Sequence, residues 1–138
     1  MNGATVSVVL PIYNGAAVVS DAIQSIILQS YTDWELIIID DGSTDDSLLI
    51  AEEYESSDPR IKVYQNPLNL GLAATMNRGV EIAAGDYIAV QEQDDMSVPS
   101  RLAKEVQILD AMPAVSLVSG IAEWLDDELQ PTNYFPGI

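Results

Sequence analysis

The stretch WELIIIDDGS, residues 34–43, joins a buried strand to an acidic turn. Residues 34–39 are apolar on both faces apart from Glu35, which is typical of a strand in the middle of a parallel sheet. The strand runs directly into the acidic turn, where Ser43 and Asp46 have the spacing of a capping box. We therefore expect a second helix of the fold to begin at Ser43.

Strands and helices alternate on both sides of this stretch. Before it, residues 5–10 form a β-branched apolar strand closed by Pro11, and apolar pairs four residues apart predict a helix that ends near Ser30. After it, further strands are predicted over residues 61–65, 87–90 and 115–119. Two helices separate these strands: one is opened by Pro99, and the other has one side lined by Ala73, Met76, Asn77, Val80 and Ala84.

This alternation predicts an α/β fold with a doubly wound, mainly parallel sheet and helices on both faces. In such sheets, ligands bind at the carboxyl ends of the strands. A chain of 138 residues with 48% hydrophobic residues has room for one domain with one core.

Composition excludes several classes of function. The 22 acidic and 5 basic residues give a net charge of −17, which disfavours nucleic acid and anionic membranes as partners. Because the chain has no Cys and no His, disulfides, thiolate or imidazole metal ligands, and Cys or His catalysis are excluded. No stretch approaches the roughly 20 apolar residues of a membrane segment, and the N-terminus lacks a basic signal-peptide start, so we expect a cytoplasmic location.

Polar clusters follow three of the predicted strands and should meet at one edge of the sheet. The clusters are residues 11–14, 40–43 and 92–95. Carboxylates gathered at such an edge favour Mg²⁺ or Mn²⁺, which would bring phosphate oxygens as further ligands; these carboxylates are Glu92, Asp94 and Asp95.

The first two clusters suggest recognition of a nucleoside. Tyr13 offers a ring on which a nucleobase can stack, and Asp41 can accept a hydrogen bond from a base imide or a ribose hydroxyl. Each feature also has a structural interpretation: a solvated acidic turn for residues 92–95, packing for Tyr13, and a helix-dipole acid for Asp41.

Three segments together resemble the family 2 glycosyltransferases, which have the Rossmann-like GT-A fold and use nucleotide-sugar donors. The resemblance covers residues 5–120, and the segments are VSVVLPIYNGAAVVSDAIQSIILQSYTDWELIIIDDGSTDDS, NPLNLGLAATMNRGVEIAAGDYIAV and QEQDDMSVPSRL. The last occupies the place of the DxD motif, which reads ExD here because its first acid is Glu92. Met76 stands where many relatives carry Arg.

The resemblance implies a metal-dependent glycosyltransferase module. It would bind a nucleotide diphosphate sugar, with a leaning to a UDP-sugar, for transfer to a hydroxyl of a saccharide or lipid-linked acceptor. The implied cofactor is Mn²⁺ or Mg²⁺, with Asp94 and Asp95 as metal ligands. The implied donor-binding residues are Pro11, Tyr13, Asn14, Asp41, Glu92 and Asp94.

Family members usually continue beyond this point into an acceptor-binding half that carries an acidic general base. We therefore expect residues 1–138 to be the donor-binding portion of a single domain, C-terminally truncated, with the acceptor-binding half absent and the catalytic base unassigned. The remaining downstream acids are expected at the surface: Glu123, Asp126 and Asp127. Apolar surface left uncovered would favour self-association.

Two other functions fit parts of the pattern. A noncatalytic nucleotide-binding or interaction module would keep the same fold and donor site without transfer. A phospho-acceptor receiver domain would also use an acidic pair after a strand to hold Mg²⁺, but it needs a Lys after the fifth strand. No basic residue follows residue 119; the five are Arg60, Lys62, Arg78, Arg101 and Lys104.

Overall fold

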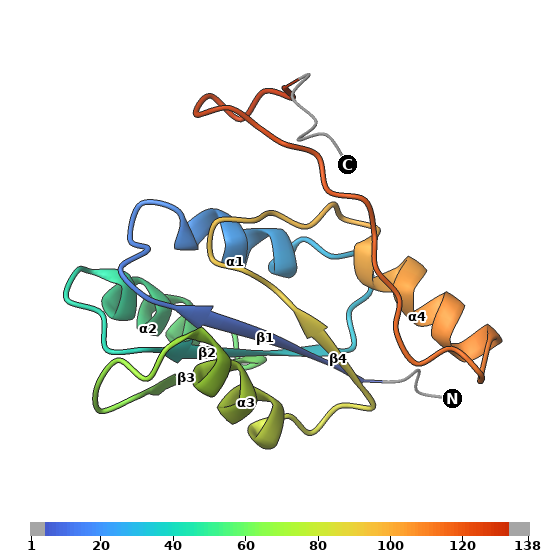
Figure 1. Cartoon of the computed structure of the whole chain (residues 1–138), viewed down its shortest axis with the longest axis horizontal. Coiled ribbons are helices and arrows are strands. Elements are labelled where there is room, and N and C mark those ends of the chain that lie inside the picture. The colour runs from blue at the N-terminus through green and yellow to red at the C-terminus, as the bar shows by residue number, and fades with distance from the viewer. Residues whose placement is uncertain (1–4, 133–138) are drawn as a thin grey trace.

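The computed structural model describes residues 5–132. Four strands form one parallel sheet in the order β3-β2-β1-β4, and helices connect them (Figure 1). The elements in chain order are β1 (Val6–Ile12), α1 (Val19–Ile27), β2 (Trp34–Asp40), α2 (Ser47–Ser57), β3 (Ile61–Gln65), α3 (Leu72–Ile82), β4 (Tyr87–Val90) and α4 (Arg101–Ala111).

Strands β1 and β2 form the buried centre of the sheet, as their apolar runs predict. They pair in register from Val6 opposite Trp34 to Ile12 opposite Asp40. Pro11 does not close β1, because the strand continues to Ile12. The Val9 carbonyl accepts a hydrogen bond from the Gln91 N–H, so the backbone N–H and C=O groups of odd-numbered residues in β1 point toward β4. The pairing with β4 ends at Val9. Pro11 lies beyond it, so its lack of an N–H removes no hydrogen bond between β1 and β4.

Helices cover both faces of the sheet, which confirms the predicted fold class. One core contains alternate residues of β1 and β2 together with buried residues of α1, α2 and α4. On the opposite face, α3 packs against β1 and β2, and Figure 1 shows α1 and α3 on opposite sides of the sheet. The buried side of α3 is formed by Thr75 and Gly79. Ala73 and Val80, which were predicted to line one side of this helix, are exposed. Small residues face the sheet because the helix backbone lies close to it.

Helix α2 begins at Ser47, so the predicted capping box at Ser43 is wrong. The Ser43 Oγ accepts a hydrogen bond from the Asn14 N–H instead, at 3.0 Å. The carboxylate of Asp45 accepts hydrogen bonds from the N–H groups of Ser47 and Ala16, each at 3.0 Å. Hydrogen bonds with the loop after β1 therefore fix the turn, and the helix begins only after it, at Ser47.

The predicted strand over residues 115–119 does not form. This segment borders β4 and α4 around a shared cavity but makes no ladder with β4. A parallel strand needs cover on both faces, and Leu117 is 85% exposed. Figure 1 shows the chain after α4 running back past that helix and then away from the sheet. In the part of the chain that the structure describes, no helix is long and apolar enough to cross a bilayer.

Candidate functional site

An open cavity of about 390 Å³ lies at the carboxyl ends of β1 and β2. Its walls come from these strand ends, the loop before α3, the first turn of α3 and the loop after β4. The lining residues are Pro11, Ile12, Tyr13, Asp41, Asn69, Gly71, Leu72, Thr75, Glu92, Gln93 and Asp94. Five residues expected at a donor site from the sequence are thus brought together around one space: Pro11, Tyr13, Asp41, Glu92 and Asp94.

Asp41 is buried at the end of β2, where hydrogen-bond donors converge on its carboxylate. Its Oδ1 accepts hydrogen bonds from the Asn66 Nδ2 at 2.7 Å and the Leu70 N–H at 2.8 Å. Its Oδ2 accepts one from the Gly71 N–H at 2.9 Å. Burial alone would raise the pKa of Asp41, but these hydrogen bonds outweigh it and lower the pKa below its ordinary value. Asp41 therefore stays charged, with acceptor capacity on Oδ2 for a ligand.

Asn66 and Arg78 hold Asp41 in place and were not identified from the sequence. The Arg78 Nη1 donates to the Asn66 Oδ1 at 2.6 Å and to the Gln65 carbonyl at 2.8 Å. The guanidinium thus fixes the amide of Asn66 with its oxygen toward Arg78 and its nitrogen toward Asp41 and Thr75. The turn-rich sequence NPLNLG marked the loop, but no local spacing relates Asn66 to a strand end 25 residues earlier.

Tyr13 directly follows β1, and the residue is 44% exposed. Its N–H donates to the Gln93 Oε1 at 2.9 Å, and the Gln93 Nε2 donates to the Tyr13 carbonyl at 3.1 Å. The ring is therefore available to a ligand while the backbone is held from the loop after β4.

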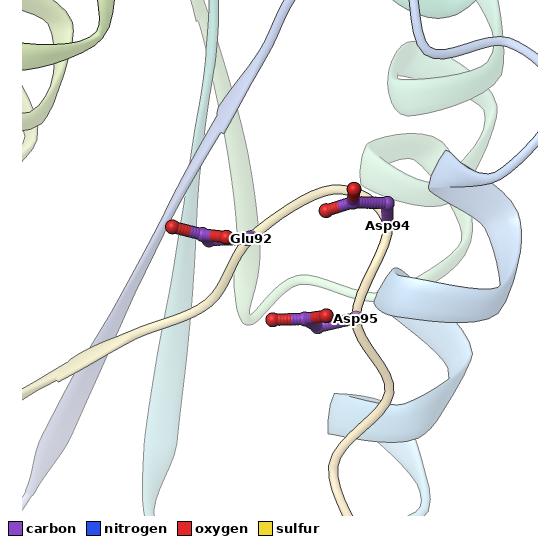
Figure 2. A group of neighbouring side chains, drawn as sticks. All are labelled: Glu92, Asp94 and Asp95. Carbon is purple, nitrogen blue, oxygen red and sulfur yellow. The ribbon is translucent and has the colours of Figure 1, made fainter. Parts of the chain in front are cut away.

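Three carboxylates gather on the loop after β4. We call Glu92, Asp94 and Asp95 the acid group; they offer carboxylate oxygens that all lie within 4.8 Å of one another. Figure 2 shows the three side chains along this loop, Glu92 on one limb and Asp94 and Asp95 on the other. All three side chains are exposed, and none of the cavity-lining residues among residues 5–132 is Lys or Arg. Three hard oxygen donors without a neighbouring cation fit Mg²⁺ or Mn²⁺.

A buried glutamine braces this loop from behind. The Gln91 Nε2 donates to the carbonyls of Asp95 at 2.7 Å and Glu92 at 3.2 Å. Its Oε1 accepts hydrogen bonds from the Ser97 Oγ at 2.7 Å and the Arg101 Nη1 at 3.2 Å. Arg101 also pairs with Glu105 and donates to the Val90 carbonyl, so its charge is engaged behind the loop.

The other predicted site residues lie outside the cavity lining. The Asn14 Oδ1 accepts hydrogen bonds from the N–H of Thr44 at 2.8 Å and its Oγ1 at 3.3 Å, so this side chain joins two loops. Asp95 belongs to the acid group without lining the cavity. The downstream acids Glu123, Asp126 and Asp127 are exposed, as expected, and do not line it either.

Comparisons with known proteins show which family the sequence of this chain matches. The family model described as glycosyl transferase family 2 matches residues 7–133. EpsE of Bacillus subtilis (strain 168), whose name describes it as a glycosyltransferase, is 47% identical over 110 residues, covering 79% of this chain and 40% of EpsE.

Solved structures share the fold. S. aureus TarS 1-349 in complex with UDP-GlcNAc matches with a TM-score of 0.74 and 26% identity over 79% of this chain and 32% of that one. Mannosyltransferase PcManGT from Pyrobaculum calidifontis, in complex with GDP-Man and Mn²⁺, matches with a TM-score of 0.73 over 79% of this chain and 33% of that one. At 22% identity this second likeness shows the fold alone. The chain thus spans well under half of the length of each of these proteins.

Proposed function

The chain belongs to glycosyl transferase family 2, and from this premise we propose that its cavity binds the nucleoside diphosphate part of a sugar donor. In the whole protein, the sugar would pass to an acceptor hydroxyl. Residues 1–138 supply the donor-binding portion of this activity. The observation that carries the proposal is that an exposed aromatic ring, a buried charged carboxylate and two members of the acid group, Glu92 and Asp94, line one cavity, with no Lys or Arg among its lining residues in the described range 5–132.

Tyr13 and Asp41 form the base half-site. The exposed Tyr13 ring provides a stacking surface, and the Oδ2 of Asp41 accepts a hydrogen bond from a donor such as the imide N–H of uracil. A UDP-sugar is the favoured donor because a base with an imide N–H suits a carboxylate acceptor. The structure of TarS with UDP-GlcNAc supports this choice, at 26% identity.

The acid group would hold a divalent metal ion at the diphosphate. Without such an ion, two negatively charged groups would face each other, since no Lys or Arg among residues 5–132 lines the cavity. Glu92, Asp94 and Asp95 would supply carboxylate ligands, and Mn²⁺ or Mg²⁺ when bound would offset the charge on the departing diphosphate. Gln91 and Arg101 hold the loop that carries these ligands.

Calorimetric titration of UDP with Mn²⁺ or with EDTA tests the proposal. UDP should bind much more tightly with Mn²⁺, and Asp94→Ala should remove that gain, while the exposed Asp21→Ala serves as a matched control. Equal affinity in EDTA would contradict the metal site. Absence of binding under both conditions would contradict the donor site itself.

A noncatalytic nucleotide-binding module predicts the same titration and differs only in sugar transfer. The family match favours the glycosyltransferase over a phospho-acceptor receiver domain.

A further inference from the structure

We propose that Gln93 is a positioning residue that fixes the base half-site relative to the acid group, so that both ends of the donor bind as one unit. This inference rests on the proposed function. Gln93 lies between Glu92 and Asp94 in the chain, yet its amide bonds to the backbone of Tyr13. We call this pair of hydrogen bonds the Gln93 clamp.

The clamp bridges two strand ends that the sheet itself leaves unconnected. Pairing between β1 and β4 reaches only Val9 and Val90, followed by the Gln91 N–H donating to the Val9 carbonyl. Beyond that point, the Gln93 clamp supplies the hydrogen bonds that join residues 12–16 to residues 92–95, within the range that the structure describes. Both N–H and C=O of Tyr13 are engaged, so the amide of Gln93 imitates one more rung of the ladder.

Gly15 provides an independent sign that this space is reserved for Gln93. A Cβ added at Gly15 would overlap the Oε1 and Cδ of Gln93. The backbone of Gly15 cannot readily move aside, because its N–H donates to the Ser47 Oγ at 2.8 Å and its carbonyl accepts from the N–H of Val19 at 2.9 Å. The absence of a side chain at residue 15 therefore leaves room for the clamp.

Each half of the site is also held without Gln93. On the base side, the Ile12 carbonyl accepts from the Asp41 N–H at 2.8 Å, and the Asn14 N–H donates to the Ser43 Oγ at 3.0 Å. On the acid side, Gln91 holds the carbonyls of Glu92 and Asp95. Loss of the clamp should therefore leave the base half-site and the acid group each formed, while the distance between them is no longer fixed.

A fixed separation matters because UDP with its metal ion contacts both halves at once. Two linked contacts strengthen each other only when the protein holds them at the spacing that the ligand spans. The clamp should thus contribute to binding of the whole nucleotide and little to binding of either end.

The test compares three ligands on wild-type protein and on Gln93→Met, which keeps the side-chain length and removes both hydrogen bonds. Uridine alone and Mn²⁺ alone should each bind within about twofold of wild type, whereas UDP with Mn²⁺ should bind roughly tenfold more weakly. Gln107→Met, at an exposed position of α4, is the matched control and should change none of the three affinities.

Gly15→Ala provides a second, independent disruption, since it displaces the Gln93 amide while leaving Gln93 itself in place. It should produce the same pattern, and a thermal melt verifies that both variants are folded. Equal weakening of uridine, Mn²⁺ and UDP would show a merely structural residue and would overturn the role of Gln93. Unchanged binding of UDP with Mn²⁺ in both variants would also overturn it. Failure of wild-type protein to bind UDP would instead contradict the proposed function on which this role rests.

Discussion

Asp41 keeps a negative charge in a buried position because Asn66, Leu70 and Gly71 donate hydrogen bonds to it. Its depressed pKa means that the unfolded chain takes up a proton at a higher pH than the folded chain does. The stabilisation from Asp41 is therefore complete above the unfolded pKa, about pH 4, and is lost as the pH falls through the folded pKa.

Asp41→Asn should lower the free energy of unfolding at pH 7 by roughly 1–3 kcal/mol, because the amide nitrogen replaces one carboxylate oxygen and must face an existing donor. That donor is the Gly71 N–H if the nitrogen replaces Oδ2, and the Leu70 N–H with the Asn66 Nδ2 if it replaces Oδ1. The difference from wild type should shrink as the pH falls below about 4. Urea denaturation at pH 7 and pH 3 measures both effects, with the exposed Asp21→Asn as control. An equal difference at the two pH values would show that the charge of Asp41 is not what stabilises the fold.

The site residues that could be predicted from the sequence lie at the strand ends or in the loops that follow them. Tyr13, Asp41 and Glu92 follow their strands, so their convergence at one edge of the sheet could be expected, and all three line the cavity. Gln93 and Arg78 could not be assigned, because each acts through a hydrogen bond to a residue 80 or 12 positions away. Such partners become visible only once the fold brings them together.

The packing of α3 on the sheet depends on a small residue, Gly79. Gly79 faces the sheet, where an added Cβ would overlap Val9 and lie 3.3 Å from the Ile39 Cδ1. Val9 is β-branched and belongs to the central strand, so it has little freedom to move aside.

Gly79→Ala should therefore destabilise the protein by roughly 1–3 kcal/mol, despite the better helix propensity of Ala. Chemical denaturation measures this loss. Gly120→Ala is the matched control, since nothing lies near a Cβ at that position, and it should fall within about 0.5 kcal/mol of wild type. A stabilised Gly79→Ala protein would indicate that propensity outweighs packing at this contact.

The four strands of the sheet in the described part of the chain could be predicted from the sequence, and the edge strands β3 and β4 have their predicted bounds. The continuous apolar runs of β1 and β2 identify the centre of the sheet, where burial and propensity agree. The run at residues 115–119 is also mostly apolar, apart from Ser116 and Ser119, but it lies beside β4 with too little cover to form a strand. Apolar composition shows that a segment would benefit from burial, and only the surrounding chain determines whether it is buried.

At the scale of the whole molecule, the chain has a net charge of −17, and its cavity is itself lined by acidic residues. In the part of the chain that the structure describes, the only carboxylates lining the cavity are those of Asp41, Glu92 and Asp94. Hydrogen bonds from Asn66, Leu70 and Gly71 engage Asp41, and we assign the other two to metal binding. None is left to deprotonate an acceptor hydroxyl.

We therefore expect the 138-residue chain to bind a UDP-sugar without transferring the sugar efficiently. The measurement is an acceptor screen with a labelled donor, run beside a longer form of the protein that includes any sequence beyond Ile138. Slow hydrolysis of the donor by water is compatible with this expectation and should disappear in Asp94→Ala. Efficient transfer by the 138 residues would place the base elsewhere, and Glu123, Asp126 and Asp127 would be the first residues to replace.

The way in which Asp41 is held also limits how base preference can be redesigned. The N–H groups of Leu70 and Gly71 that donate to it belong to the main chain, and the donor at position 70 is kept by any residue other than proline. Leu70 can therefore be varied in a library without disturbing recognition of the base. Exchanging Asp41 alone is not enough for a nucleobase that presents an acceptor here. An asparagine that turns its amide nitrogen outward in place of Oδ2 keeps the hydrogen bond from the Leu70 N–H but leaves the Gly71 N–H without its acceptor. A switch of donor nucleotide requires the loop and the strand end to be rebuilt together.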